Sequence, residues 1–173
     1  MPVDMKRIAK FEKVSSGQFV ESWRDIFGSD RGAEDAFEKI PLPRRATTGS
    51  AGYDFSLPFD LELAPGQTAK IPTGIRARID EGWVLLLYPR SGLGFKYRLQ
   101  LNNTVGVIDS DYYHSSNEGH IFIKITNDSN EDRTLSLKAG DCFAQGIFTP
   151  YGITEDDNTD GVRDGGFGST SVR

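Results

Sequence analysis

The apolar residues near the start of the chain recur at helical spacing. One amphipathic stretch ends at Phe27, directly before Gly28, which is typical of a residue that stops a helix. A second and shorter helical pattern ends before Pro41, which cannot continue a helix. We therefore expect two short helices between residues 19 and 40. Their apolar positions are Phe19, Val20, Trp23, Ile26 and Phe27 in the first, and Ala33, Ala36, Phe37 and Ile40 in the second.

From about residue 52 to residue 150 the pattern changes to short β-type runs separated by turn signals. Several runs alternate apolar and polar residues with the period of two that is typical of a half-buried strand. The expected strands are 67–71, 75–79, 83–88, 121–126 and 142–149. Because we find no helical pattern between them, the sequence predicts an all-β sandwich or barrel and not a parallel α/β sheet.

Chain length and polarity indicate how the chain is organised. A chain of 173 residues fits one compact domain. We expect a single β domain at 1–150, with a helical insertion at about 19–40. The polar and glycine-rich remainder, 151–173, is expected to form a flexible tail.

The net charge of −5 argues against broad binding to nucleic acid, which needs a basic face. The longest apolar run, 84–88, is too short to cross a membrane, and the single cysteine, Cys142, favours a reducing compartment. Together with His114 and His120 it forms no zinc-binding motif. We expect a cytoplasmic protein with neither a nucleic-acid nor a membrane partner, and exclude zinc deaminases and zinc hydrolases.

Two segments carry groups that suit phosphate or a metal. Arg90, Ser91 and Gly92 follow a buried strand and combine a guanidinium, a hydroxyl and flexible backbone amides. Asp54 follows a run of small residues and is placed to contact the water shell of a metal. Ordinary loops and turns contain such residues too, so neither segment is decisive alone.

A third segment, 103–112, joins an amide, an apolar strand, two carboxylates and an aromatic ring. On an extended backbone Asp109 and Asp111 alternate onto the same face, and one of them is a candidate base that activates water. A turn that is merely rich in aspartate fits this segment equally well.

Two later segments are weaker signals by themselves. Gln145 interrupts an apolar strand, where a buried structural amide is the simpler interpretation. The segment 163–170 combines Arg163, glycines, Phe167 and hydroxyls and resembles a lid, although its composition alone favours a disordered tail.

In their order along the chain, these five segments resemble the five motifs of the trimeric dUTPase family, over roughly residues 41–170. The resemblance implies a jelly-roll-like β-clip fold and a homotrimer whose active sites are shared between subunits. It also implies that the chain hydrolyses dUTP to dUMP and pyrophosphate, which lowers dUTP and supplies dUMP for thymidylate synthesis.

The same resemblance implies roles for individual residues. Asp109 would activate the water that attacks the α-phosphorus, and Tyr112 would lie against the deoxyribose. Mg²⁺ would be held by the phosphates and water, with Asp54 acting through that water. The uracil would contact Asn103, Gly106, Ile108 and Phe167, and the phosphates would contact Arg90, Ser91, Gly92, Gln145, Arg163, Ser169 and Thr170. Gly168 would also bind the substrate.

Three features depart from the family pattern. The helical stretch 19–40 is inserted; packing on the outside is its simpler role, and binding of a protein partner is the alternative. The segment 113–118 is longer than usual, so we expect its tip to project. The last motif is one residue shorter between Arg163 and Phe167, which weakens the assignment of Arg163.

Two other functions remain open from the sequence. A dCTP deaminase-like enzyme would share the fold but attack the base. A nucleotide-sensing or partner-binding protein would keep the fold without catalysis.

Overall fold

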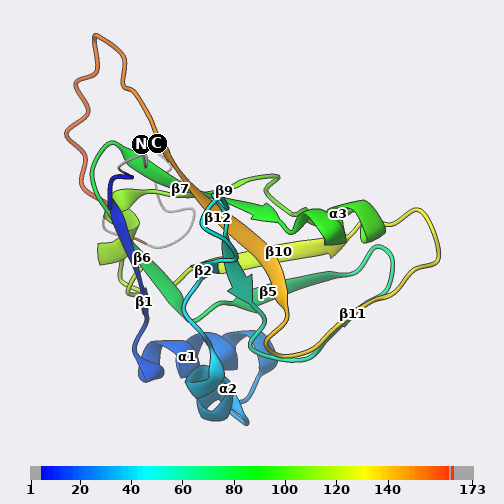
Figure 1. Ribbon diagram of the computed structural model, residues 1–173. Helices are drawn as coiled ribbons and strands as arrows, with labels where there is room; N and C mark the ends of the chain where they lie inside the picture. The colour runs from blue at the N-terminus through cyan, green and yellow to red at the C-terminus, as the bar shows by residue number, and fades with distance from the viewer. Residues whose placement is uncertain (1–4, 164, 166–173) are drawn as a thin grey trace.

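The computed structural model describes residues 5–163 and 165. Its elements are β1 (Ala9–Lys13), α1 (Ser16–Phe27), α2 (Ala33–Lys39), β2 (Arg44–Arg45), β3 (Tyr53–Ser56), β4 (Leu61–Leu63), β5 (Thr68–Pro72), β6 (Ile75–Ile79), β7 (Trp83–Pro89), α3 (Ser91–Tyr97), β8 (Leu99–Leu101), β9 (Gly106–Ile108), the 3₁₀ turn η1 (Ser110–His114), β10 (Phe122–Asn127), β11 (Leu135–Leu137) and β12 (Cys142–Pro150). The expected mostly-β fold with a helical region near the N-terminus is confirmed (Figure 1).

The largest sheet is five-stranded, in the order β2-β3-β12-β7-β9, and its pairings are antiparallel. Strand β7 lies near its edge and pairs with β12 on one side and with β9 on the other. A three-stranded sheet, β5-β10-β8, and the pairs β1-β6 and β4-β11 complete the β structure. Strand β9 therefore ends the large sheet, with one edge turned away from β7.

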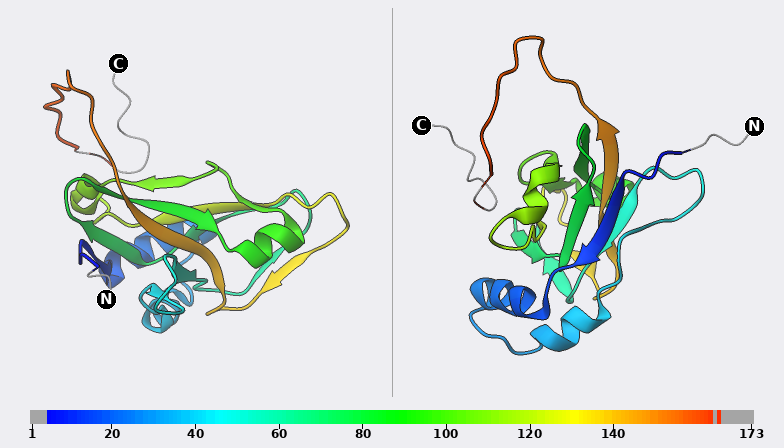
Figure 2. Two further views of the ribbon diagram at one scale, coloured as in Figure 1. Left: turned by 45° about the horizontal axis from the view of Figure 1, so that its top comes forward. Right: turned by 90° about the vertical axis from the view of Figure 1, so that its left-hand side faces the viewer.

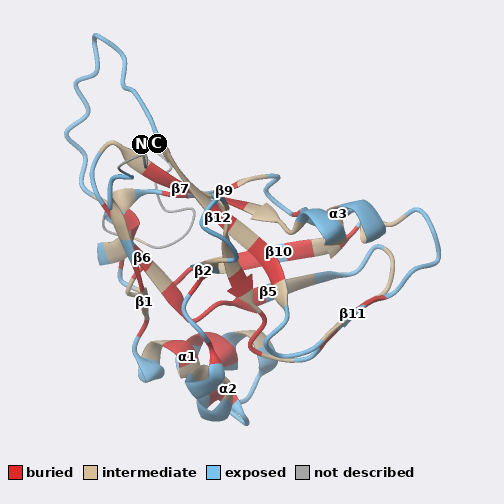
Figure 3. Ribbon diagram, in the orientation of Figure 1, coloured by how far each residue is buried: buried red, intermediate tan, exposed pale blue. Residues whose placement is uncertain are grey.

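Buried apolar side chains form the core. Figure 3 marks the buried residues in red along the strands and on α1. The strands alternate buried and exposed positions, as their sequence pattern predicts. Burying one large apolar side chain stabilises a fold by about 1.5–3 kcal/mol, so the core is the main source of stability. The largest fully buried side chains include Phe55, Phe143, Ile71, Leu85, Leu87, Ile108, Ile123 and Ile125.

The predicted helices α1 and α2 lie together at one end of the molecule (Figure 1). Helix α1 begins earlier than its apolar pattern indicates because the Ser15 hydroxyl caps it, accepting a hydrogen bond from the Gln18 backbone N–H at 3.2 Å. It ends as predicted at Gly28, whose φ of 74° is the left-handed conformation that glycine adopts without strain. No helix in the described ranges is long and apolar enough to cross a membrane.

One helix was not predicted. Helix α3 occupies 91–97, where the sequence pattern predicts a loop after a buried strand. It contains two glycines, Gly92 and Gly94, which weaken a helix, and it has no buried residue, so its apolar pattern is poor. The expectation that no helix separates the strands was therefore wrong at this point.

The imidazole of His120 joins α1 to the β structure and is fully buried. Its Nε2 accepts a hydrogen bond from the Gly74 backbone N–H at 2.9 Å, and its Nδ1 lies 3.0 Å from the Ser22 hydroxyl on α1. Nε2 can accept only when it carries no proton, so the neutral ring with the proton on Nδ1 fits this site. Burial lowers the pKa of His120 to about 4 from its ordinary value of 6.5.

This depressed pKa predicts a loss of stability in mild acid. As the pH falls below 6.5, His120 becomes protonated in the unfolded chain, whereas in the folded chain it stays neutral down to about pH 4. The free energy of unfolding therefore falls by up to about 3 kcal/mol between these two pH values. Urea unfolding of the wild type and of His120→Gln at pH 7, 6, 5 and 4 measures it. The gap in unfolding free energy between the two proteins should shrink steadily towards pH 4. A constant gap would contradict the prediction.

Candidate active site

Three of the sequence-predicted segments converge on one open pocket of about 380 Å³. They converge because their strands are neighbours: Asp54 on β3 pairs with Gln145 on β12, and Gln145 pairs with Tyr88 on β7, two residues before Arg90. Local sequence could not show this, since the segments are far apart in the chain. The lining residues are Ala46, Ser50, Ala51, Gly52, Asp54, Arg90, Ser91, Gly92, Gln145 and Ile147.

The polar groups of this pocket contact one another. The Arg90 guanidinium lies 3.1 Å from the Asp54 carboxylate, and 40% of the Arg90 side chain remains exposed. The Gln145 amide donates to the Pro89 carbonyl at 3.1 Å, which fixes its direction at the end of β7. A Cβ on residue 52 would collide with the Gln145 side chain, so Gly52 permits this close approach. The pocket thus offers a cation and backbone amides to an anionic ligand.

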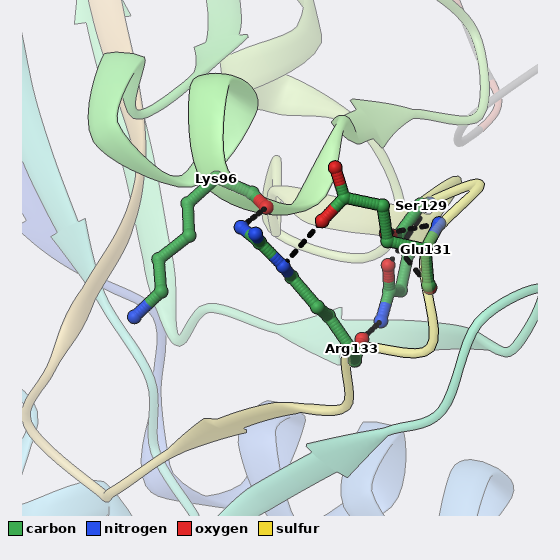
Figure 4. A network of polar contacts seen from close by, with 5 residues as sticks. Lys96, Ser129, Glu131 and Arg133 are labelled. Atoms are coloured by element: carbon green, nitrogen blue, oxygen red, sulfur yellow. Dashed lines mark hydrogen bonds and ion pairs between the residues drawn. The ribbon is translucent and has the colours of Figure 1, made fainter.

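Helix α3 supplies two further groups to the pocket, because Ser91 and Gly92 form its first turn and are exposed. Backbone N–H groups in a first turn have no partner within the helix and are free to bind an anion. At the other end, the Lys96 carbonyl accepts a long hydrogen bond of 3.5 Å from Arg133, which also pairs with Glu131 (Figure 4). This network ties α3 to the loop after β10.

Asp109 lies outside that pocket, directly after β9. Its backbone is extended, with φ −76° and ψ 158°, whereas Asp111 belongs to η1. The expectation that the two aspartates alternate along one extended segment was therefore wrong, because the chain turns after Asp109 and the Tyr112 N–H donates to the Asp109 carbonyl at 3.2 Å. Both carboxylates are about half exposed.

Arg163 from the tail brings the two carboxylates together. Its Nη2 lies 2.7 Å from the Asp109 carboxylate and its Nε lies 2.8 Å from that of Asp111. The guanidinium also stands 5.8 Å from the centre of the Tyr112 ring, and only 10% of the Arg163 side chain is exposed. The described part of the tail therefore returns to its own chain's aspartates.

Tyr112 is buried, with 3% of its surface exposed. Its hydroxyl donates to the His120 carbonyl at 2.6 Å and accepts from the Asn117 amide at 2.8 Å. Burial raises its pKa, so the phenol stays neutral in the physiological range. Sequence reasoning missed Asn117 and His120 as supports of this ring, because nothing in the local pattern marks them.

The segment 113–118 does not project, contrary to expectation. Tyr113 donates its hydroxyl to Glu12 on β1, and the Arg76 guanidinium stacks on its ring at 3.6 Å. Further along, Glu118 accepts hydrogen bonds from Ser15 at the start of α1. Side-chain contacts at both ends therefore hold the extra residues against the domain.

The remaining predicted residues have distinct positions. Asn103 is exposed in the turn between β8 and β9, whereas Gly106 and Ile108 are buried within β9. The backbone of Gly106 runs close to Leu87 on β7, which leaves no room for a larger side chain. Phe167, Gly168, Ser169 and Thr170 lie outside the described residues.

Asp109 and the pocket around Arg90 lie at opposite ends of β7. Ile108 pairs with Leu85, so Asp109 lies beside the start of β7, while Arg90 follows its last residue. Six residues at roughly 3.3 Å each separate the two positions by about 20 Å. Figures 1 and 2 agree, with α3 at one end of the molecule and the yellow-green η1 at the other. Asp109 and Arg90 therefore lie well apart within one copy of the chain.

The side chains near the pocket indicate how a metal ion could be held. Among the described residues no group of three or more His, Cys, Asp or Glu side chains is placed to hold a metal ion. Asp54 lies in the pocket beside Arg90, where a single carboxylate can accept hydrogen bonds from a metal's water shell. Mg²⁺ commonly keeps several waters and binds few carboxylates, so this set fits Mg²⁺ carried by phosphates.

Residues 38–171 match the model of the dUTPase family. The chain belongs to the dUTPase family. A deoxyuridine 5′-triphosphate nucleotidohydrolase of Lactococcus lactis is 41% identical over 136 residues, covering 77% of this chain and 89% of that protein. One from Photorhabdus laumondii is 40% identical over 139 residues, covering 76% and 87%.

Solved structures agree with this membership. The dUTPase of Streptococcus mutans aligns with a TM-score of 0.61 and 34% identity, covering 84% of this chain and 98% of that one. A dUTPase of Staphylococcus bacteriophage 80alpha aligns with a TM-score of 0.62 at 22% identity, which supports the fold only. Helix α1 precedes the residues that match the dUTPase family model.

The close approach at Gly106 yields a prediction. A Cβ there would lie 2.9 Å from the Leu87 Cβ, so Gly106→Ala should push β9 from β7 and destabilise the protein by about 1–3 kcal/mol. Gly49→Ala is the control, since a Cβ at residue 49 meets nothing within 4 Å. Thermal unfolding at fixed protein concentration compares them. Equal melting temperatures would contradict the predicted clash.

Proposed function

We propose that this chain hydrolyses dUTP to dUMP and pyrophosphate with Asp109 as the base that activates the attacking water. As a member of the dUTPase family, the chain is a dUTP diphosphatase of nucleotide metabolism. The observation that carries the assignment of the base is the exposed Asp109 carboxylate three residues before the buried Tyr112. In the cell this reaction lowers dUTP and supplies dUMP for thymidylate synthesis.

In the proposed mechanism Asp109 accepts a proton from water as that water attacks the α-phosphorus. In this structure Arg163 donates to one oxygen of that carboxylate, Oδ2, and so lies where the water would approach. The negative phosphates of the substrate offer Arg163 another partner. We therefore infer that the tail leaves Asp109 when substrate arrives, and that Arg163 then contributes to phosphate binding with Ser169 and Thr170.

The edge strand β9 is the proposed reader of the base. Because β9 ends the large sheet, the edge that it turns away from β7 carries backbone groups available to a ligand. Backbone groups of Gly106 and Ile108, with the side-chain amide of Asn103, would hydrogen-bond the uracil. A different base would leave such groups unpaired, which gives strong discrimination. Phe167 and Gly168 of the tail would cover the uracil, and the Tyr112 ring would exclude a ribose 2′-hydroxyl.

The pocket beside α3 is the proposed phosphate site. Arg90 offers a guanidinium, and Ser91 and Gly92 offer first-turn backbone groups, with Gln145 on the neighbouring strand. Bound Mg²⁺ would neutralise phosphate charge, with Asp54 contacting its water shell. Catalysis then depends on positioning and charge neutralisation.

The separation of about 20 Å along β7 supports an assembly in which copies share active sites. Arg90 of one copy and Asp109 of another would act on one dUTP, as in the expected homotrimer. Symmetric closed assemblies of this kind produce identical shared sites. A division into a β domain at 1–150 and a tail at 151–173 belongs to the same proposal, because the tail would reach a neighbour's site. We place the protein in the cytoplasm.

The alternatives make different products. A dCTP deaminase-like enzyme would release ammonia, and a nucleotide-sensing protein would release neither ammonia nor pyrophosphate. A protein partner of the 19–40 insertion is compatible with any of these functions. The family match and the Asp109–Tyr112 arrangement favour dUTP hydrolysis.

Replacing each aspartate in turn tests the base. Asp109→Asn should lower pyrophosphate release from dUTP by about 10²–10⁴-fold while dUTP binding persists, because an amide cannot accept the proton. Asp111→Asn is the matched control, since both carboxylates pair with Arg163, and it should lose less than about tenfold. Pyrophosphate and ammonia are measured with dUTP, dCTP, dTTP and UTP in Mg²⁺. Equal losses in both variants would reject Asp109 as the base.

Complementation tests the shared site. Arg90→Ala and Asp109→Asn chains should each be nearly inactive alone, but co-expressed chains with different tags should regain activity. Random mixing places both intact residues in about one site in four of a symmetric assembly. Failure of the mixed species, purified through both tags, to exceed either parent would show that each site belongs to one copy.

A further inference from the structure

Two segments that depart from the family pattern contact each other. Helix α1 lies outside the matched residues 38–171, and the segment 113–120 contains the extra residues after Tyr112. The Glu118 carboxylate accepts a hydrogen bond from the Ser15 backbone N–H at 2.7 Å and another from the Ser15 hydroxyl at 2.6 Å. Ser15 is the N-cap of α1, so a side chain 103 residues away secures the start of this helix.

A second contact lies two residues further on. The His120 ring accepts from the Gly74 N–H through Nε2, so Nδ1 carries the proton and donates to the Ser22 hydroxyl at 3.0 Å. Ser22 in turn donates to the Gln18 carbonyl within α1 at 2.9 Å. The buried ring therefore links α1 to the turn before β6 through hydrogen bonds of fixed direction.

The same segment holds Tyr112. The phenol donates to the His120 carbonyl at 2.6 Å and accepts from the Asn117 amide at 2.8 Å. Asn117 itself accepts from the Gly119 N–H at 3.2 Å. Residues on both sides of Glu118 thus fix the Tyr112 hydroxyl, and Tyr112 lies one 3₁₀ turn after Asp109.

We propose that α1, through Glu118 and His120, positions Tyr112 and Asp109 for catalysis, and that Glu118 is a positioning residue for sugar selectivity. The inference rests on the proposed role of Tyr112 against the deoxyribose. If the ring is held firmly, a ribose 2′-hydroxyl has no room beside it. If the anchoring carboxylate is lost, segment 117–120 relaxes, the ring shifts, and UTP becomes a better substrate.

A purely structural role for Glu118 would have a different signature. Loss of a helix-capping contact lowers stability but leaves the relative rates for two substrates unchanged. The chain offers a matched control in Asp60, whose carboxylate accepts from the Ala139 N–H and from Lys138, each at 2.9 Å. Hydrogen bonds lower the pKa of both carboxyl groups, so Glu118→Ala and Asp60→Ala remove similar anions. Asp60 has no contact with the 112–120 segment among the described interactions.

The experiment measures kcat/KM for dUTP and for UTP, with thermal unfolding, in full-length wild type, Glu118→Ala, Glu118→Gln, Ser15→Ala, the double variant and Asp60→Ala. We expect Glu118→Ala to lower the dUTP-to-UTP ratio by roughly tenfold or more, since small displacements in an active site have effects of this size. Glu118→Gln keeps an acceptor oxygen and should fall between. Ser15→Ala should be non-additive with Glu118→Ala because the two residues form one contact. Asp60→Ala should lower the melting temperature and keep the ratio.

The outcomes separate this inference from the proposed function. A strong wild-type preference for dUTP that persists within about twofold in Glu118→Ala, despite a lower melting temperature, overturns the positioning role alone. A wild-type ratio near one overturns the proposed role of Tyr112 and this inference with it. If Glu118→Ala does not fold, Glu118→Gln and Ser15→Ala decide: an unchanged ratio in both overturns the inference, and a lowered ratio supports it.

Discussion

The pairing of β7 on both of its edges is the constraint on which the rest of the structure depends. Pairing with β12 brings Gln145 to the end of β7, and Asp54 on β3 lies beside Gln145. Both residues therefore line the pocket around Arg90. Pairing with β9 sends the chain back, so that Asp109 emerges at the start of β7. The register cannot slip by one residue without turning Leu85 and Leu87 out of the core, because side chains alternate between faces along a strand. The buried pattern of β7 therefore sets the positions of both Arg90 and Asp109, which lie at opposite ends of this strand.

Much of the fold could be predicted from local pattern because its causes are local. A continuous apolar run marked β7, a turn signal marked the start of β12, and Gly28 marked the end of α1 since a left-handed residue is needed there. Helix α3 escaped prediction because Gly92 and Gly94 weaken a helix and because it buries no residue that would give it an apolar pattern. The site residues were predictable only through the resemblance, because their individual motifs are short and common. Which strands bring them together depends on long-range pairing that spacing does not reveal.

The hydrogen-bond partners of His120 likewise could not be predicted from the local sequence. The sequence around His120 and Glu118 carries no signal of their partners, which lie between 46 and 103 residues earlier in the chain. Folding pairs them because a buried imidazole must satisfy both nitrogens, and Ser22 and Gly74 satisfy them. Such a network is costly when partly satisfied, which makes its geometry well defined. In the proposed arrangement α1 would act on the active site by fixing the segment that holds Tyr112.

The contact of Arg163 with both aspartates gives the tail two competing partners. In the structure the guanidinium bridges Asp109 and Asp111 and lies over Tyr112, covering the surface where water and sugar would bind in the proposed mechanism. Arg163 can pair either with the carboxylates of Asp109 and Asp111 or with the phosphates of a nucleoside triphosphate. The triphosphate presents the greater charge density. Substrate therefore provides the differential interaction that a shift between two tail positions requires. In the proposed mechanism the transfer of Arg163 from Asp109 to the phosphates would uncover the carboxylate and close the tail over the substrate in one event.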